Sequence, residues 1–267
     1  MNAPGTDLAA LLGPAGRTSR PAPAWRAALA QTGMELRLTA RRGENLLVTL
    51  VIPVGLLLFL ASVSILPTGG QAPVDFLLPG ILALAVISTS LVNLGIATAY
   101  ERAYGVLKRL GGSPLSRSGL LAAKMASVLA VELLQAVVLI AIAAGVEGWR
   151  PGPGWSLPLV VVALLLGTLA FAGLGLLMAG ALRAEATLAG ANGLYLVLLL
   201  LGGVVLPVDH LPPLLADLAQ VLPASALSDA LRIGLGAASG DALGPLALLA
   251  GWGAATALLA ARTFRWE

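Results

Sequence analysis

The chain has 267 residues, of which 58% are hydrophobic and 11% are charged, and its formal net charge is +3 at pH 7. Soluble domains carry about 25% charged residues, so this composition excludes a soluble globular protein and indicates an integral membrane protein. Cysteine is absent and His210 is the single histidine, which excludes disulfides, thiolate metal sites and histidine clusters.

The first part of the chain divides near residue 25. Residues 1–24 are rich in proline, glycine and alanine and lack the apolar core of a signal peptide, so we expect a flexible tail. From residue 25 on, apolar residues share one helical face and basic residues lie about a third of a turn away: Trp25, Leu29 and Leu36, then Arg26, Arg37 and Arg41. This pattern predicts an amphipathic helix in the lipid headgroup layer. The alternative is a soluble lead-in whose arginines only fix the topology.

Residues 25–267 are expected to form one transmembrane domain. Six apolar runs, each long enough to cross a bilayer core as a helix, lie at 46–66, 76–100, 119–146, 157–182, 187–206 and 243–261. Only Arg183 to Ala186 separate the fourth run from the fifth, and their two charges predict a turn. The predicted fold is therefore all-α, with six membrane spans.

The distribution of basic residues predicts the orientation of the spans. Apart from Arg150 and Arg232, every lysine and arginine falls in the N-terminal segment, in the region from Arg102 to Lys124 around the loop between the second and third spans, between the fourth and fifth spans, or after the sixth. Lysine and arginine stay in the cytoplasm, so both termini are expected there. Arginine also far outnumbers lysine amid abundant alanine, glycine and proline, which suggests a bacterial chain and hence a bacterial inner membrane.

The loop between the second and third spans has the pattern of a short helix. Val106, Leu107 and Leu110 have helical spacing, and Gly111 and Gly112 follow as a terminator. This predicts an exposed helix over Glu101 to Leu110, with apolar side chains and basic flanks, that docks into a groove on a cytoplasmic partner. A topological anchor, rich in positive charge, is the alternative.

The loop also resembles a known family. It is similar to the second cytoplasmic loop of type 2 ABC exporter permeases, the group that includes daunorubicin-resistance-type drug exporters, at Glu101, Arg102, Gly105, Leu107, Arg109, Leu110, Ser113, Pro114, Leu115, Ser116 and Lys124. Further resemblance lies at Leu78 to Gly80, at Leu222 to Arg232, and at Phe264 and Arg265. One departure is Ala103, where family members often carry a second acid.

The resemblance implies roles for two segments. The helix from Trp25 resembles the family's interfacial connecting helix. The loop resembles the coupling helix, which sits in a cleft of the nucleotide-binding subunit, and its implied ATPase-coupling residues are Glu101, Arg102, Gly105, Leu107, Lys108, Arg109 and Leu110.

The chain lacks a phosphate-binding loop, because neither Lys108 nor Lys124 follows a glycine. ATP and magnesium are therefore expected on a partner ATPase, in two copies, and not on this chain. The other expected partners are membrane lipid and a second permease subunit, as a homodimer or a heterodimer. No nucleic acid is expected.

Between the fifth and sixth spans, residues 207–240 are moderately apolar and broken at Pro212, Pro213 and Pro223. Two short amphipathic helices at the outer face fit this pattern, and the resemblance implies a segment that re-enters the membrane and helps gate the exit. A plain external loop is the alternative. His210 is expected at a surface or interface.

Polar residues inside the spans have two interpretations. Glu132 and Gln135 lie one turn apart in the third span, and a charged carboxylate there is costly, so Glu132 must face protein or water or be protonated. A structural hydrogen bond is favoured over proton coupling. Other polar residues form a candidate substrate path or hold helices together: Ser88, Thr89, Asn93, Asn192 and Tyr195.

These features predict the transmembrane subunit of an ATP-driven exporter. Its substrate is expected to be amphipathic, drug-like or lipid-like, because the walls are apolar and offer few charges. The alternative is a proton-coupled secondary transporter that uses Glu132; the lack of an inverted repeat disfavours it.

Overall fold

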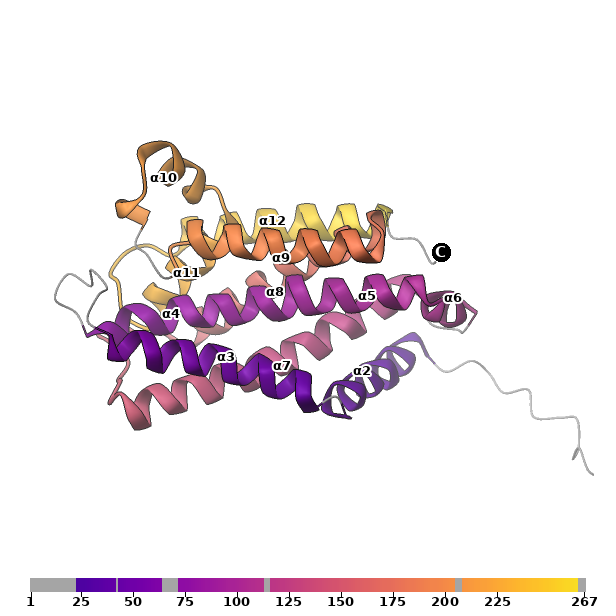
Figure 1. Cartoon of the computed structure of the whole chain (residues 1–267), viewed down its shortest axis with the longest axis horizontal. Helices are drawn as coiled ribbons and strands as arrows, with labels where there is room; N and C mark the ends of the chain where they lie inside the picture. The colour runs from indigo at the N-terminus through magenta and orange to yellow at the C-terminus, as the bar shows by residue number, and fades with distance from the viewer. Residues whose placement is uncertain (1–22, 42, 64–71, 113–115, 205–207, 264–267) are drawn as a thin grey trace, which may run out of the picture.

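The computed structural model describes residues 23–41, 43–63, 72–112, 116–204 and 208–263. Within these ranges all regular structure is helical, as predicted. Most helices lie nearly parallel along one long axis (Figure 1): α3 (Gly43–Ser62), α4 (Pro73–Val86), the π-helix η1 (Ile87–Asn93), α5 (Leu94–Ala103), α7 (Arg117–Val146), α8 (Leu157–Ala181), α9 (Ala184–Leu201) and α12 (Leu243–Thr263).

Five helices of the described part are long and apolar enough to cross a membrane, or up to six if a bent pair before the last one counts as a span. They lie where the second to sixth spans were predicted, and α4, η1 and α5 together form one of them, Pro73–Ala103. The first predicted span corresponds to α3, whose apolar part, Leu47–Ser62, is shorter. The end of that predicted run, from residue 64, lies outside the described residues.

The span formed by α4, η1 and α5 lies at the centre of the bundle and is buried along most of its length. Its apolar side chains Leu77, Leu78 and Ile81 are fully buried and belong to the same core cluster as Phe171 of α8. Small residues let α5 and α8 approach closely, because a Cβ built on Gly95 would lie 3.1 Å from the Cα of Gly175. Gly175, in the fourth predicted run, therefore serves close packing within this chain.

The bent pair consists of α10 (Pro213–Gln220) and α11 (Pro223–Gly234), which meet at 74°. Each helix begins with a proline, whose fixed φ suits a first helical turn, and a short break separates them. The helix α11 is mostly buried, whereas α10 exposes Leu214 and Leu218. This confirms two short helices before the last span. The short 3-10 helix η2 (Val208–His210) precedes them, and His210 is exposed, as expected.

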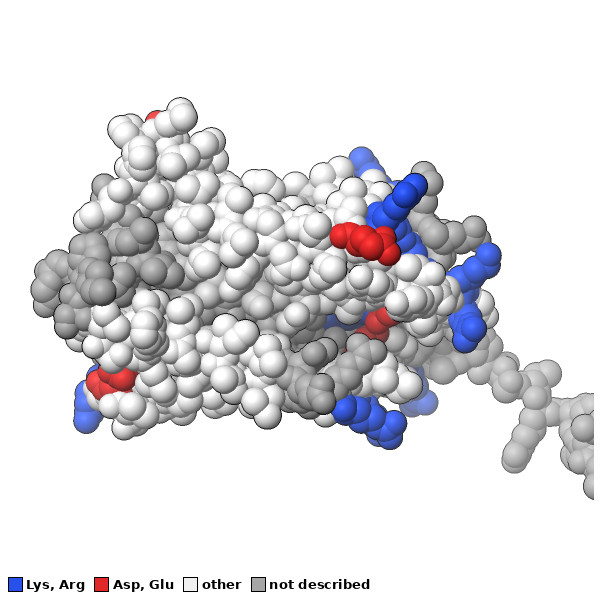
Figure 2. Space-filling model, viewed as in Figure 1, with Lys and Arg blue, Asp and Glu red and all other residues white. Residues whose placement is uncertain are grey.

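Charged side chains gather at the two ends of the bundle, and the band between them is nearly free of charge on the face seen in Figure 2. One end holds the short helix α6 (Val106–Gly111), the turn from α8 to α9, and the last turn of α12. We call it the basic end, because Lys108, Arg109, Arg183 and Arg262 are exposed there. The helix α2 (Ala24–Arg41) lies beside it, packed obliquely against α7.

Candidate functional site

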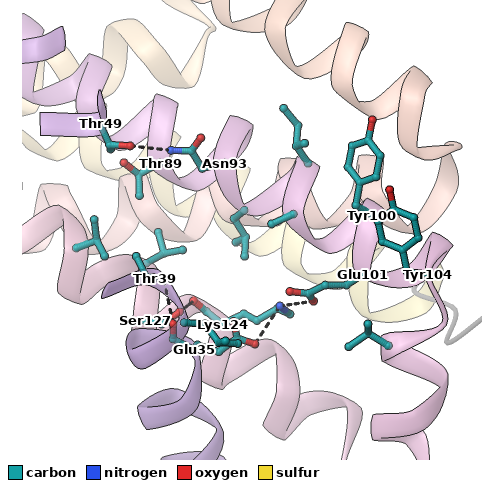
Figure 3. A pocket seen from close by; sticks show the side chains of 17 residues that line it. Glu35, Thr39, Thr49, Thr89, Asn93, Tyr100, Glu101, Tyr104, Lys124 and Ser127 are labelled. Carbon is teal, nitrogen blue, oxygen red and sulfur yellow. Dashed lines mark hydrogen bonds and ion pairs between the residues drawn. The ribbon is translucent and has the colours of Figure 1, made fainter. Parts of the chain in front are cut away.

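A cleft of about 550 Å³ opens between α2, α3, the span of η1 and α5, and α7 (Figure 3). Part of its wall is apolar, with Leu94, Ile96 and Val128 among the lining residues. The rest is polar and includes Glu35, Thr49, Thr89, Asn93, Glu101 and Lys124. An apolar wall with a few convergent polar groups is typical of a site for a small molecule.

Lys124 of α7 is the most deeply buried charged group of this cleft, with 1% of its surface exposed. Its Nζ lies 2.7 Å from Oε2 of Glu101 on α5 and 3.1 Å from Oε1 of Glu35 on α2 (Figure 3). Gln31 also donates to that Glu35 oxygen, at 2.9 Å. A buried ammonium group is tolerable only when it is paired, so these contacts hold Lys124 in place and tie three helices together.

The predicted single helix over Glu101 to Leu110 is wrong. The span α5 runs on to Ala103, so Glu101 and Arg102 belong to it, and a turn at Tyr104 and Gly105 separates it from α6. Gly105 has a φ of 71°, a left-handed conformation that glycine adopts without the steric cost that a Cβ brings. The chain therefore bends here, and the separate short helix begins at Val106.

The side chain of Leu107, expected to be exposed, is fully buried. It packs with Leu120 of α7, and Leu110 is half-buried against the same pair. The solvent-facing surface of α6 instead carries Val106, Lys108 and Arg109. The helical spacing correctly indicates that Leu107 and Leu110 share one face of the helix. That face packs against the start of α7 in the same chain and is not exposed to a partner.

Arg102 points away from the cleft. Its guanidinium donates hydrogen bonds to the carbonyl oxygens of Gly180 and Leu182, where α8 ends and the chain turns into α9. The last carbonyls of a helix lack partners within the helix, so Arg102 stabilises this turn. Adjacent residues of α5 thus serve different purposes: Glu101 pairs with Lys124, and Arg102 caps α8.

Polar side chains of η1 bind α7 inside the bundle. The hydroxyl of Thr89 donates to Oε1 of Gln135 at 3.0 Å, and the Gln135 amide donates to the carbonyl oxygen of Thr49 at 2.9 Å. These contacts connect η1, α7 and α3. A π-helix presents residues at positions that a regular α-helix would not, and such segments are frequent at functional sites.

Glu132 is buried where α7 meets η1 and α8. Ser90 of η1 and Thr168 of α8 both donate their hydroxyl hydrogens to its carboxyl oxygens. The carboxyl group of Glu132 therefore connects α7 with η1 and α8. Glu132 does not line the cleft, so the arrangement resembles helix packing more than an open ion path.

The structure does not bring the candidate path residues together. Thr89 and Asn93 line the cleft, where Asn93 donates to the Thr49 hydroxyl at 3.4 Å. Asn192 is exposed on α9 and donates to the carbonyl oxygen of Leu188 in its own helix. Ser88 and Tyr195 are half-buried away from the cleft, and Tyr195 packs on the apolar core.

The predicted amphipathic helix forms as α2. Trp25 and Leu29 are exposed and Leu36 is half-buried. The basic residues of the pattern are also exposed, and the guanidinium of Arg26 lies 5.2 Å from the Trp25 ring centroid; these residues are Arg26, Arg37 and Arg41. The inner side of the helix meets α7 and supplies Glu35 to the cleft.

The ion pairs of Lys124 were not predicted. Neither the helical pattern nor the resemblance assigns a role to Glu35, and neither predicts a contact for Lys124. A lysine near the start of a mostly apolar run is the signal that points to them, because a charge placed there needs a partner.

The fold is that of a multi-pass helical membrane protein, and the cleft lies near its basic end. Residues 29–235 match the family model of the ABC-2 type transporter. The chain therefore belongs to the ABC-2 type transporter family and is a membrane permease of this type. Such permeases typically pair with an ABC ATPase and have no nucleotide-binding site of their own. Comparison with curated proteins finds no match, and the described residues hold no group of three or more metal-ligating side chains.

Proposed function

We propose that this chain is the transmembrane subunit of an ATP-driven exporter in a bacterial inner membrane. Two permease subunits, identical or different, pair with two copies of a separate cytoplasmic ATPase, which binds ATP and magnesium. The complex moves an amphipathic, drug-like or lipid-like substrate out of the cytoplasm. The basic end faces the cytoplasm, so both termini lie there.

The position of α6 and its exposed basic side chains are the observation that carries this proposal. The helix α6 is short and lies beyond the end of α5 at the basic end, and it exposes Lys108 and Arg109 while Leu107 anchors it to α7. A partner can bind the exposed basic side chains of α6. If that partner moves, α6 moves with it and displaces α5 and α7, to which α6 is attached. The proposed ATPase contacts are Val106, Lys108 and Arg109, with Gly105 setting the bend and Leu107 and Leu110 seating the helix.

The remaining parts of the chain fit this arrangement. The exposed Trp25 and Leu29 suit a connecting helix in the headgroup layer. The exposed leucines of α10 suit a segment that enters the outer leaflet. Glu132 has two hydroxyl partners on neighbouring helices, which supports a structural role and disfavours proton coupling.

Charge reversal on α6 tests the proposal. The double variant Lys108→Glu and Arg109→Glu should insert and fold normally, because both side chains are exposed, but it should lose co-purification with the ATPase and ATP-dependent export. Arg150→Glu, an exposed arginine far along the chain from α6, is the matched control and should assemble as the wild type does. Normal assembly and export by the double variant would refute coupling through α6, and ATP hydrolysis by the isolated chain would refute the separate ATPase.

A further inference from the structure

The cleft carries an unbalanced negative charge. Two carboxylates, Glu35 and Glu101, and one ammonium group, Lys124, are the charged side chains among its described lining residues. With all three ionised, their sum is one negative charge. Glu101 is the more accessible of the two acids, with 27% of its side chain exposed against 15% for Glu35.

The neighbouring arginine is not directed at these carboxylates. Arg102 follows Glu101 in the chain, but its guanidinium donates to the carbonyl oxygens at the end of α8. Lys124, in turn, is shared between both carboxylates and cannot fully satisfy either. At the edge of an apolar bundle, an excess negative charge favours a cation from outside the chain, because the low dielectric strengthens their attraction.

The lining of the cleft suits an organic cation better than a metal ion. On the side of α5 and α7, Ile96, Val128 and Val131 provide an apolar surface, which favours the hydrocarbon part of an organic molecule. Tyr100 and Tyr104 also belong to the lining, with ring centroids 5.9 Å apart, but Tyr100 packs toward Ala179 and Ala184, and both rings extend from α5 away from the Glu101 carboxylate (Figure 3). The site therefore has an anionic part and a hydrocarbon part.

From these contacts we propose that the cleft binds amphipathic organic cations, with the cationic centre near Glu101 and the apolar body against α5 and α7. This inference deepens the proposed export function by assigning a charge to its substrate. It places the binding site within one permease subunit, between the span of η1 and α5 and the helices α2 and α7.

Binding to the purified chain alone, without ATP or ATPase, tests this separately from export. Equilibrium dialysis in detergent would compare tetraphenylphosphonium, a cation, with triphenylphosphine oxide, a neutral molecule that carries the same aryl groups. The wild type should prefer the phosphonium. Glu101→Gln should weaken phosphonium binding about five- to tenfold and leave oxide binding nearly unchanged, because only the charge is removed. Glu185→Gln, an exposed acid on α9 outside the cleft, is the matched control and should bind as the wild type does.

Two further variants locate the ligand. Ala97→Phe places a ring in the cleft and should weaken both compounds. Glu35→Gln also removes one negative charge, and it replaces Glu101→Gln if that variant is not recovered folded. Unchanged phosphonium binding by the carboxylate variant, an equal loss of both compounds in it, normal binding by Ala97→Phe, or no binding by the wild type would each overturn the proposal. None of these results would bear on assembly with the ATPase.

Discussion

The close approach of α8 to η1 predicts that Gly175→Ala destabilises the protein. A Cβ at this position would lie 2.8 Å from the carbonyl oxygen of Leu91 and 2.9 Å from that of Ser90. Both are backbone atoms, so no side-chain rotation relieves the clash. Alanine gains about 0.5–1 kcal/mol over glycine inside a helix, whereas overpacking typically costs about 1–3 kcal/mol. We expect a net loss on the order of 1–2 kcal/mol.

Thermal unfolding of the detergent-purified variants, followed by tryptophan fluorescence, measures this loss. In a chain of this size about 1 kcal/mol shifts Tm by roughly 2–4 °C, so Gly175→Ala should melt several degrees below the wild type. Gly145→Ala, in α7, is the control, because a Cβ there would meet no atom within 4 Å. It should melt at or above the wild-type temperature. If the Tm of Gly175→Ala equals that of Gly145→Ala, the inference that α8 packs closely on η1 is refuted.

Three further substitutions test other contacts. Glu132→Gln should retain most export, because an amide oxygen still accepts from the neighbouring hydroxyls; a loss of pH-dependent transport with folding intact would instead favour a proton-coupled transporter. Leu107→Ala should lower the free energy of unfolding by about 2–3 kcal/mol, since its side chain is fully buried, whereas exposed Val106→Ala should change it by less than about 0.5 kcal/mol; equal Tm values for the two would contradict the seating of α6. Arg102→Ala should cost about 1–3 kcal/mol by leaving carbonyl oxygens at the end of α8 without their donor, and a Tm equal to that of the wild type would contradict this cap.

Much of the fold could be predicted from the sequence, because lipid imposes a strict condition on backbone polar groups and only long apolar helices meet it. The turn between α8 and α9 was marked by its charges, and the break before α11 by Pro223. The π-helix at Ile87–Asn93 could not be predicted, because its side chains Thr89 and Ser90 are held by partners far away in the chain.

The candidate site was only partly predictable. Polar residues in apolar runs were correctly identified as unusual, but composition cannot tell which of them meet. Thr89 and Asn93 share the cleft with Thr49, whereas Asn192 bonds within its own helix. Likewise, the spacing around Leu107 identifies one apolar helical face but not the residue that packs on it. That residue is Leu120 at the start of α7, which local spacing cannot indicate.

The position of Glu101 connects the two proposals physically. It stands in the last turns of α5, and only the bend at Tyr104 and Gly105 separates that helix from α6. A displacement of α6 by an ATPase would reach α5 through this bend and α7 through Leu107. Unequal movement of these two helices would change the distance between Glu101 and Lys124, which also pairs with Glu35 of α2. Because ionic attraction falls with distance, such a movement changes how strongly Glu101 attracts a bound cation. One carboxylate would thus respond both to the ATPase and to the substrate, which is the kind of contact that coupling between hydrolysis and release requires.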